Sequence, residues 1–151
     1  MEGSYILLVS MDMKLNPKAL KYVQTRKKDV IVLPIIDPNL IQIISDIFVE
    51  KGWLGGRSAK ELSQNLIKNH ERMRKYFIEQ VSDYFNKKSI AYEIKELNGN
   101  MRELILKEIS TRPIDEIVFS FHKGFNPIWE ASKMIIERLC AKTEIYCKIF
   151  R

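Results

Sequence analysis

Residues 117–132 read IVFSFHKGFNPIWEAS, and the interpretation of the whole chain depends on them. An apolar run, Ile117 to Phe119, leads into a polar segment and then into a helical pattern that begins at Asn126-Pro127. A strand, a turn and a helix in this order form the place where α/β proteins hold phosphate groups. Such turns are usually rich in glycine, whereas this one contains only Gly124. The stretch is a nucleotide site, the remnant of one, or an ordinary turn between a strand and a helix.

The rest of the chain alternates short apolar runs with helical patterns. Continuous apolar runs are typical of strands that are buried on both faces of a parallel sheet. We expect five strands, at residues 5–10, 29–36, 89–94, 114–121 and 145–150. Apolar residues at helical spacing predict helices between these strands. Strands that alternate with helices indicate an α/β protein, in which a parallel sheet carries helices on both faces.

Capping side chains mark where several of these helices begin. Asn16-Pro17 and Asn126-Pro127 each place an asparagine cap before a proline at the first helical position. Ser58 and Glu61 form a capping box, which starts the longest predicted helix. His70 falls on the apolar stripe of that helix, so we expect its ring to be buried.

Composition excludes several classes of protein. The chain has 151 residues and a formal charge of +6, and its basic residues are interspersed with acidic ones. We therefore expect a solvated basic surface, and we do not expect nucleic-acid binding. No apolar run approaches the roughly 18 residues that a membrane span requires, and the start of the chain lacks the basic segment of a signal peptide. We expect a soluble, cytoplasmic protein that does not engage a membrane.

The cysteines and histidines do not form a metal-ligand pattern. His70 and His122 lie far apart in the sequence, and Cys140 and Cys147 each fall in an apolar pattern. We expect two reduced, buried thiols and no disulfide framework. The glycine motifs of phosphate loops and of serine hydrolases are also absent. His122, at the end of a predicted strand, is the best single candidate for a catalytic residue.

Several stretches, taken in order, resemble the universal stress protein family, a branch of the adenine-nucleotide-binding α/β domains. The matching stretches are YILLVSMD (5–12), KALKYV (18–23), VIVLPIID (30–37), NGNMRELILKEISTRPIDEIVFS (98–120) and ASKMIIERLCAKTEIYCKIF (131–150). The resemblance implies one domain over residues 1–151 with an open five-stranded parallel sheet in the order 3-2-1-4-5. Residues of about 38–57 fall outside the resemblance, so we interpret them as an insertion between the second strand and the long helix.

The glycine motif of the nucleotide-binding members is broken in this chain. Those members carry Gly-x-x-Gly, then nine residues, then Gly-Ser or Gly-Thr. Here Ser120 and Lys123 occupy the first two glycine positions, His122 matches the histidine often found between them, and Ala131-Ser132 replaces Gly-Ser after only seven residues. Shifting the register by one places Gly124 on the second glycine but shortens the spacer further. Because a Cβ at such positions keeps phosphate oxygens away from the backbone, we interpret the stretch as a rebuilt turn.

The resemblance also implies a place for adenosine. Asp12 matches the aspartate that follows the family's first strand, and Ile35 matches the second-strand residue that lines the adenine pocket. Our leading interpretation is a non-catalytic regulatory or stress-response protein without a cofactor, because the glycine loop is lost. In one alternative the chain binds ATP or AMP weakly through an altered phosphate site of Asp12, Lys123 and Ser132. In another it is a small enzyme of the nucleotidyl-transfer kind that uses His122.

Two segments are candidates for contacts with other chains. The strand predicted at 145–150 lies at an edge of the sheet in the expected order, and an exposed apolar edge invites pairing with another chain. Universal stress proteins commonly dimerise through this strand, so the resemblance implies a homodimer with antiparallel pairing there. Residues 40–54, which include Trp53 in a glycine-flanked segment, either cover an edge of the sheet or form a surface for a protein partner.

Overall fold

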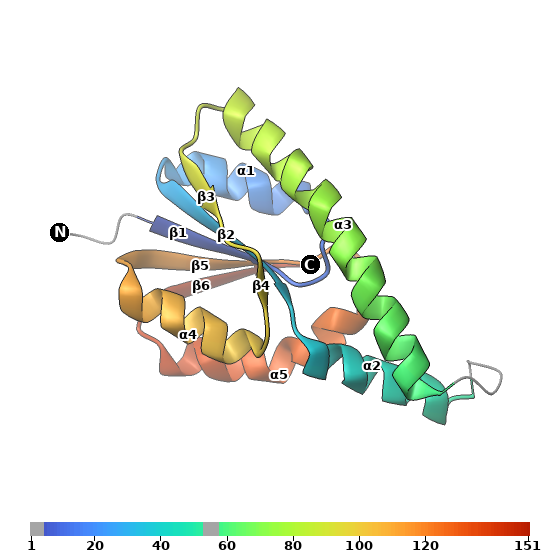
Figure 1. Cartoon of the computed structure of the whole chain (residues 1–151). Coiled ribbons are helices and arrows are strands. Elements are labelled where there is room, and N and C mark those ends of the chain that lie inside the picture. Colours follow the sequence, from blue (N-terminus) through green and yellow to red (C-terminus); the bar gives the residue numbers. More distant parts are fainter. Residues whose placement is uncertain (1–4, 53–57) are drawn as a thin grey trace.

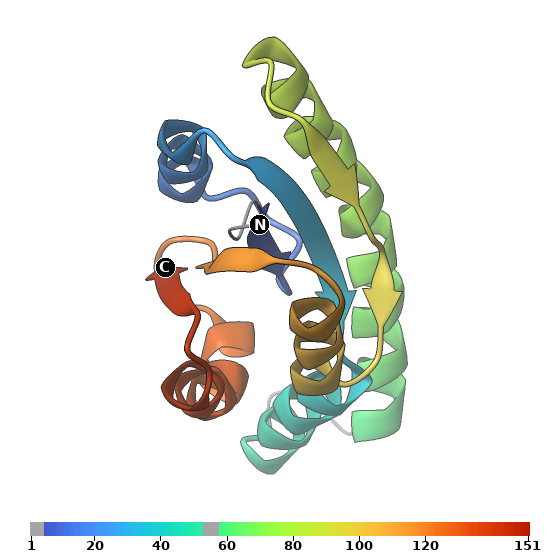
Figure 2. The same ribbon diagram turned by 90° about the vertical axis from the view of Figure 1, so that its left-hand side faces the viewer.

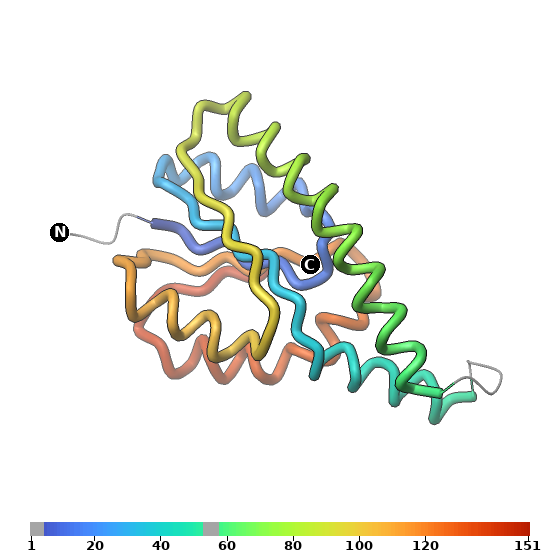
Figure 3. The backbone as a smooth tube through the Cα atoms, in the orientation of Figure 1, coloured from blue at the N-terminus to red at the C-terminus, as the bar shows by residue number. Residues whose placement is uncertain are grey.

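The computed structural model describes residues 5–52 and 58–151, in which helices separate most of the strands along the chain (Figures 1 and 3). The elements are β1 (Tyr5–Ser10), α1 (Pro17–Arg26), β2 (Asp29–Ile36), α2 (Pro38–Glu50), α3 (Ala59–Lys87), β3 (Tyr92–Ile94), β4 (Leu97–Asn98), α4 (Met101–Thr111), β5 (Ile114–Ser120), α5 (Pro127–Lys142) and β6 (Tyr146–Phe150). Trp53 and Leu54, which we considered as part of a partner surface, lie outside the described residues.

The strands form one parallel sheet in the order β3-β2-β1-β5-β6, and β4 also pairs with β2. This confirms the predicted α/β class and the order 3-2-1-4-5, in which the third predicted strand is now divided. Only Tyr92–Ile94 of the predicted 89–94 is a strand, and pairing resumes at Leu97. Between the two pieces, the Lys95 amide donates to the Val32 carbonyl at 2.9 Å, which keeps the chain beside β2.

Alternate side chains of each strand enter two different hydrophobic cores. In β1, Ile6 and Leu8 face the core beneath α1 and α3, whereas Leu7 and Val9 face the core beneath α4 and α5. Figure 2 shows these two layers of helices on opposite sides of the sheet. The continuous apolar runs in the sequence therefore have the expected cause, which is burial on both faces.

The first part of the segment interpreted as an insertion is helix α2, which is capped by Asp37. α2 packs against α3 and α5, and Leu40 and Ile44 join the core beneath α4 and α5. Figure 1 shows α2 and the first half of α3 beyond the carboxyl ends of the strands. Ile43 and Ile47, on the outer side of α2, remain exposed. Among the described helices, none combines the length and apolar character needed to cross a membrane.

Candidate functional site

The candidate site lies where the order of the strands reverses, between β1 and its neighbour β5. β1 leads into α1 on one face of the sheet, and β5 leads into α5 on the other (Figure 2). The turns at residues 11–16 and 121–126 therefore diverge at the carboxyl ends of the two strands. Open α/β sheets bind their ligands in the crevice at such a point.

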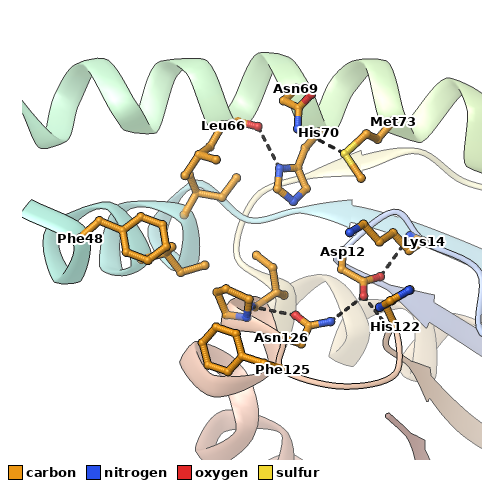
Figure 4. A pocket seen from close by; sticks show the side chains of 14 residues that line it. Asp12, Lys14, Phe48, Leu66, Asn69, His70, Met73, His122, Phe125 and Asn126 are labelled. Carbon is orange, nitrogen blue, oxygen red and sulfur yellow. Dashed lines mark hydrogen bonds between the residues drawn. The ribbon is translucent and has the colours of Figure 1, made fainter. Parts of the chain in front are cut away.

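Asp12 is buried between the two turns, and its carboxylate is fully engaged within the chain. Oδ1 accepts hydrogen bonds from the Lys14 amide at 3.1 Å and from the Ser10 hydroxyl at 3.4 Å. Oδ2 accepts from the His122 amide and from the Asn126 side chain, both at 2.7 Å (Figure 4). The Asp12 carboxylate therefore holds the two turns together. Its hydrogen bonds are charge-assisted, and such bonds are about twice as strong as neutral ones.

Two asparagine caps complete the connection between the turns. Asn16 Oδ1 accepts from the Lys18 amide at the start of α1, and its Nδ2 donates to the Phe121 carbonyl at 2.7 Å. Asn126 Oδ1 accepts from the Ile128 and Trp129 amides at the start of α5. Each cap therefore serves its own helix and also holds the opposite turn. The sequence predicted both caps, but it did not predict their second contacts.

The residues at the predicted phosphate loop differ in their access to solvent. Ser120 is buried at the end of β5, whereas His122, Lys123 and Gly124 are exposed. Gly124 has a φ of +99°, and a Cβ added there would meet no atom within 4 Å, so space alone does not require a glycine. The His122 ring has no hydrogen-bond partner within the described ranges, and hence no group that would orient it as a catalytic base.

The remaining predicted ligand residues lie in or near the core. Ile35 is fully buried beneath α4 and α5, and Ala131 packs at the edge of the same core. Ser132 is also fully buried, and its hydroxyl donates to the Ile128 carbonyl at 2.7 Å inside α5. Asp12 and Ser132 are thus both occupied internally, while Lys123 faces solvent. The structure does not bring the three together on one open surface.

A separate cavity of about 200 Å³ lies beside the two turns, and we call it the α2–α3 pocket (Figure 4). Most of its wall is apolar and comes from α2, α3 and the start of α5. The apolar lining residues are Ile41, Ile44, Phe48, Leu66, Met73, Phe125, Pro127 and Ile128. The polar lining residues are Asp12, Lys14, Asn69, His70, His122 and Asn126.

His70 projects from α3 toward the turn that carries Asp12 and Lys14 (Figure 4). The residue is only 9% exposed, as its place on the apolar stripe predicted. Its Nδ1 lies 2.8 Å from the Leu66 carbonyl, which only accepts hydrogen bonds, so Nδ1 carries the hydrogen. Sequence reasoning found the burial of His70 but not the pocket. The available signal was a histidine on the buried stripe of a helix that passes the carboxyl ends of the strands.

The two cysteines are free, as expected for reduced thiols, but both are half-buried and not buried as we expected. Cys140 on α5 and Cys147 on β6 pack against the same core. A hydrogen bond from Cys147 lowers the pKa of the Cys140 thiol. The same bond, together with burial, raises the pKa of Cys147. The residues that the structure describes contain no cluster of His, Cys, Asp and Glu that would hold a metal ion.

Comparisons with known proteins give a likeness in structure and none in sequence. No protein-family model and no curated protein matches the chain. A solved structure described as that of hypothetical protein MJ0577, a test case of structural genomics, matches with a TM-score of 0.64 and 17% identity. The match covers 99% of this chain and 96% of that one. At this identity the likeness shows the fold alone, which is an α/β fold with a parallel sheet and helices on both faces.

Proposed function

We propose that this protein is a non-catalytic regulatory protein of the universal stress protein type, acting in the cytoplasm without a standard adenine-nucleotide site. The observation that carries the proposal is the engagement of the Asp12 carboxylate by four internal donors. A ribose would have to displace the His122 amide or the Asn126 side chain from that carboxylate. Displacement of Asn126 would leave a buried donor without a partner, at a cost of about 1–3 kcal/mol.

The start of α5 also favours this proposal over a working phosphate loop. A helix N-terminus binds phosphate through free amide groups. Here Pro127 has no amide hydrogen, and the Ile128 and Trp129 amides already donate to Asn126 at 3.0 and 3.2 Å. The donors that would meet phosphate in a glycine loop are therefore used by the chain itself.

Thermal unfolding with ATP, ADP, AMP and cyclic AMP, each with and without magnesium, tests the proposal. A ligand at about 100 times its Kd adds roughly 2.7 kcal/mol to the stability of the folded state, which is a readily measured rise in Tm. We expect no rise with any of these nucleotides. A rise that the Lys123→Ala variant abolishes would overturn the proposal and establish the altered phosphate site in its place.

We further propose that the protein acts as a homodimer joined through β6. This strand pairs with β5 and is the last strand of the sheet order. The Phe150 carbonyl accepts from Phe121 on the β5 side, so by alternation the backbone groups of Cys147 and Ile149 point away from β5. An outward-facing apolar edge of this kind is suited to antiparallel pairing with a second copy.

Light scattering of the wild type and of Ile149→Pro tests the homodimer. Proline at position 149 removes an outward amide, whereas proline at position 148 removes an inward one that belongs to the ladder with β5. We expect a dimeric wild type, a folded monomeric Ile149→Pro variant, and a Lys148→Pro variant that is destabilised as well. A wild type that is monomeric at working concentration would refute the dimer.

A further inference from the structure

We propose that the α2–α3 pocket binds a small aromatic carboxylate that carries a hydroxyl group. The ligand's hydroxyl donates to His70 Nε2, and its aromatic ring lies against the apolar wall of the pocket. Its carboxylate pairs with the Lys14 ammonium group at the mouth of the pocket. This inference goes beyond the function proposed above and does not depend on it, because its polar contacts are His70 and Lys14 rather than Asp12, Lys123 and Ser132. Its starting point is a polar atom on the pocket wall to which the described residues form no hydrogen bond.

His70 supplies that atom. With the hydrogen on Nδ1 donated to Leu66, the neutral ring presents a lone pair on Nε2. The described residues form no hydrogen bond to Nε2, which keeps some access to solvent although the residue as a whole is only 9% exposed. Its ring lines the pocket (Figure 4). A ligand that brings an O–H to this position forms a hydrogen bond that the chain itself does not supply.

The apolar wall and the volume of the pocket indicate the size and the apolar character of the ligand. Ile44 and Phe48 of α2 face Leu66 and Met73 of α3 across the pocket. Phe125 lines the same cavity and is 82% exposed, which is unusual for so large an apolar side chain. A volume of about 200 Å³ is below the range of about 300–1,000 Å³ in which drug-sized molecules bind, so a single ring is a suitable body.

The charges around the pocket favour an anion. Asp12 is its acidic lining residue, and the carboxylate is already saturated by internal donors. Lys14 is exposed at the mouth, and its ammonium group makes no ion pair within the described ranges. An ammonium without a partner beside an apolar cavity attracts a carboxylate attached to an apolar body.

Titrations with 4-hydroxybenzoate, benzoate and phenol test the proposal by calorimetry and by chemical shifts in the protein's amide spectrum. We expect the wild type to bind 4-hydroxybenzoate about tenfold more tightly than benzoate or phenol, because each of the latter lacks one polar contact. This comparison needs no variant, so a folding defect cannot confuse it. No binding of any probe at about 5 mM would overturn the proposal.

Variants then assign the contacts. His70→Leu removes the acceptor, so the preference for 4-hydroxybenzoate over benzoate is expected to disappear while benzoate still binds. Lys14→Gln is expected to remove the preference over phenol, and the exposed Lys75→Gln serves as the matched control without effect. Ile44→Trp fills the cavity and is expected to abolish binding of all three probes. Binding that survives Ile44→Trp in a folded protein would place the ligand elsewhere and refute the pocket.

Discussion

Asp12 and Glu116 are two buried carboxylates, 5% and 1% exposed, that stabilise the fold in different ways. Asp12 lies at the carboxyl ends of the strands and accepts hydrogen bonds from two main-chain amides, a hydroxyl and a side-chain amide. Glu116 lies within β5 and meets side chains of α1. Its Oε2 accepts from the Tyr22 hydroxyl, and Arg26 Nε lies 3.1 Å from Oε1 without the angle of a hydrogen bond.

The difference shows what each carboxylate fixes. Asp12 holds the backbone of both turns, so its loss frees the loops that shape the candidate site. Glu116 joins one helix to the sheet through long side chains, one of which, Arg26, is 44% exposed and remains solvated without it. We therefore expect the loss of a carboxylate that binds main-chain amides to cost more stability than the loss of one that binds only side chains.

The largest effect is expected for Asp12→Ala. This change leaves the partly buried His122 amide and the buried Asn126 side chain without their acceptor, and we expect a loss of about 3 kcal/mol in the free energy of unfolding. Urea unfolding measures the loss. Asp83→Ala, an exposed change on α3, is the matched control and should cost less than about 0.5 kcal/mol. Equal losses for the two variants would show that Asp12 does not fasten the turns.

Glu116→Gln is expected to have a smaller effect, because the amide keeps the shape of the side chain. It weakens the bond from Tyr22 and removes the attraction to Arg26, for an expected loss of about 1.5 kcal/mol. Asp115→Asn, at the neighbouring position, removes the partly exposed pair with Lys28 and should cost less than about 1 kcal/mol. A larger loss for Glu116→Gln than for Asp12→Ala would reverse the comparison between the two carboxylates.

The fold was predictable from the sequence because its signals are local. The Asn16-Pro17 and Asn126-Pro127 caps lie next to the helices that they start, and the strands β1 and β2, six and eight residues long, are apolar except for one polar residue at an end of each. β4 was not predicted, because a strand of two residues is too short to show a period.

The candidate site was less predictable, because it depends on contacts between distant residues. Asp12 and Asn126 are separated by 114 positions, and no local pattern indicates that the amide of one reaches the carboxylate of the other. The burial of His70 followed from helical spacing. The pocket in front of its second nitrogen depends on how α2 and α3 pack beyond the sheet, which the spacing of apolar residues does not determine.

The hydrogen bond to Glu116 also makes stability depend on pH. Burial, with this bond, raises the pKa of Tyr22 from its ordinary value of 10.0 to about 12. The folded state therefore holds the phenol proton more tightly than the unfolded state. This contribution is complete below pH 10 and is lost as the pH rises toward 12. We expect the stability difference between wild type and Tyr22→Phe to shrink over that interval, as measured by urea unfolding. A constant difference would mean that the pKa of Tyr22 is not raised.

The smallest effect is expected for Gly124→Ala, in the turn that Asp12 fastens. An alanine at a φ of +99° is strained, but its Cβ would meet no atom within 4 Å, so we expect a loss of only about 1 kcal/mol. Lys123→Ala, next to it and exposed, controls for a change in the same turn. In a working phosphate loop the glycine would also allow close approach of a ligand, and its replacement would abolish nucleotide binding. If Gly124→Ala costs as much as Asp12→Ala, the glycine and not the carboxylate determines the shape of the turn.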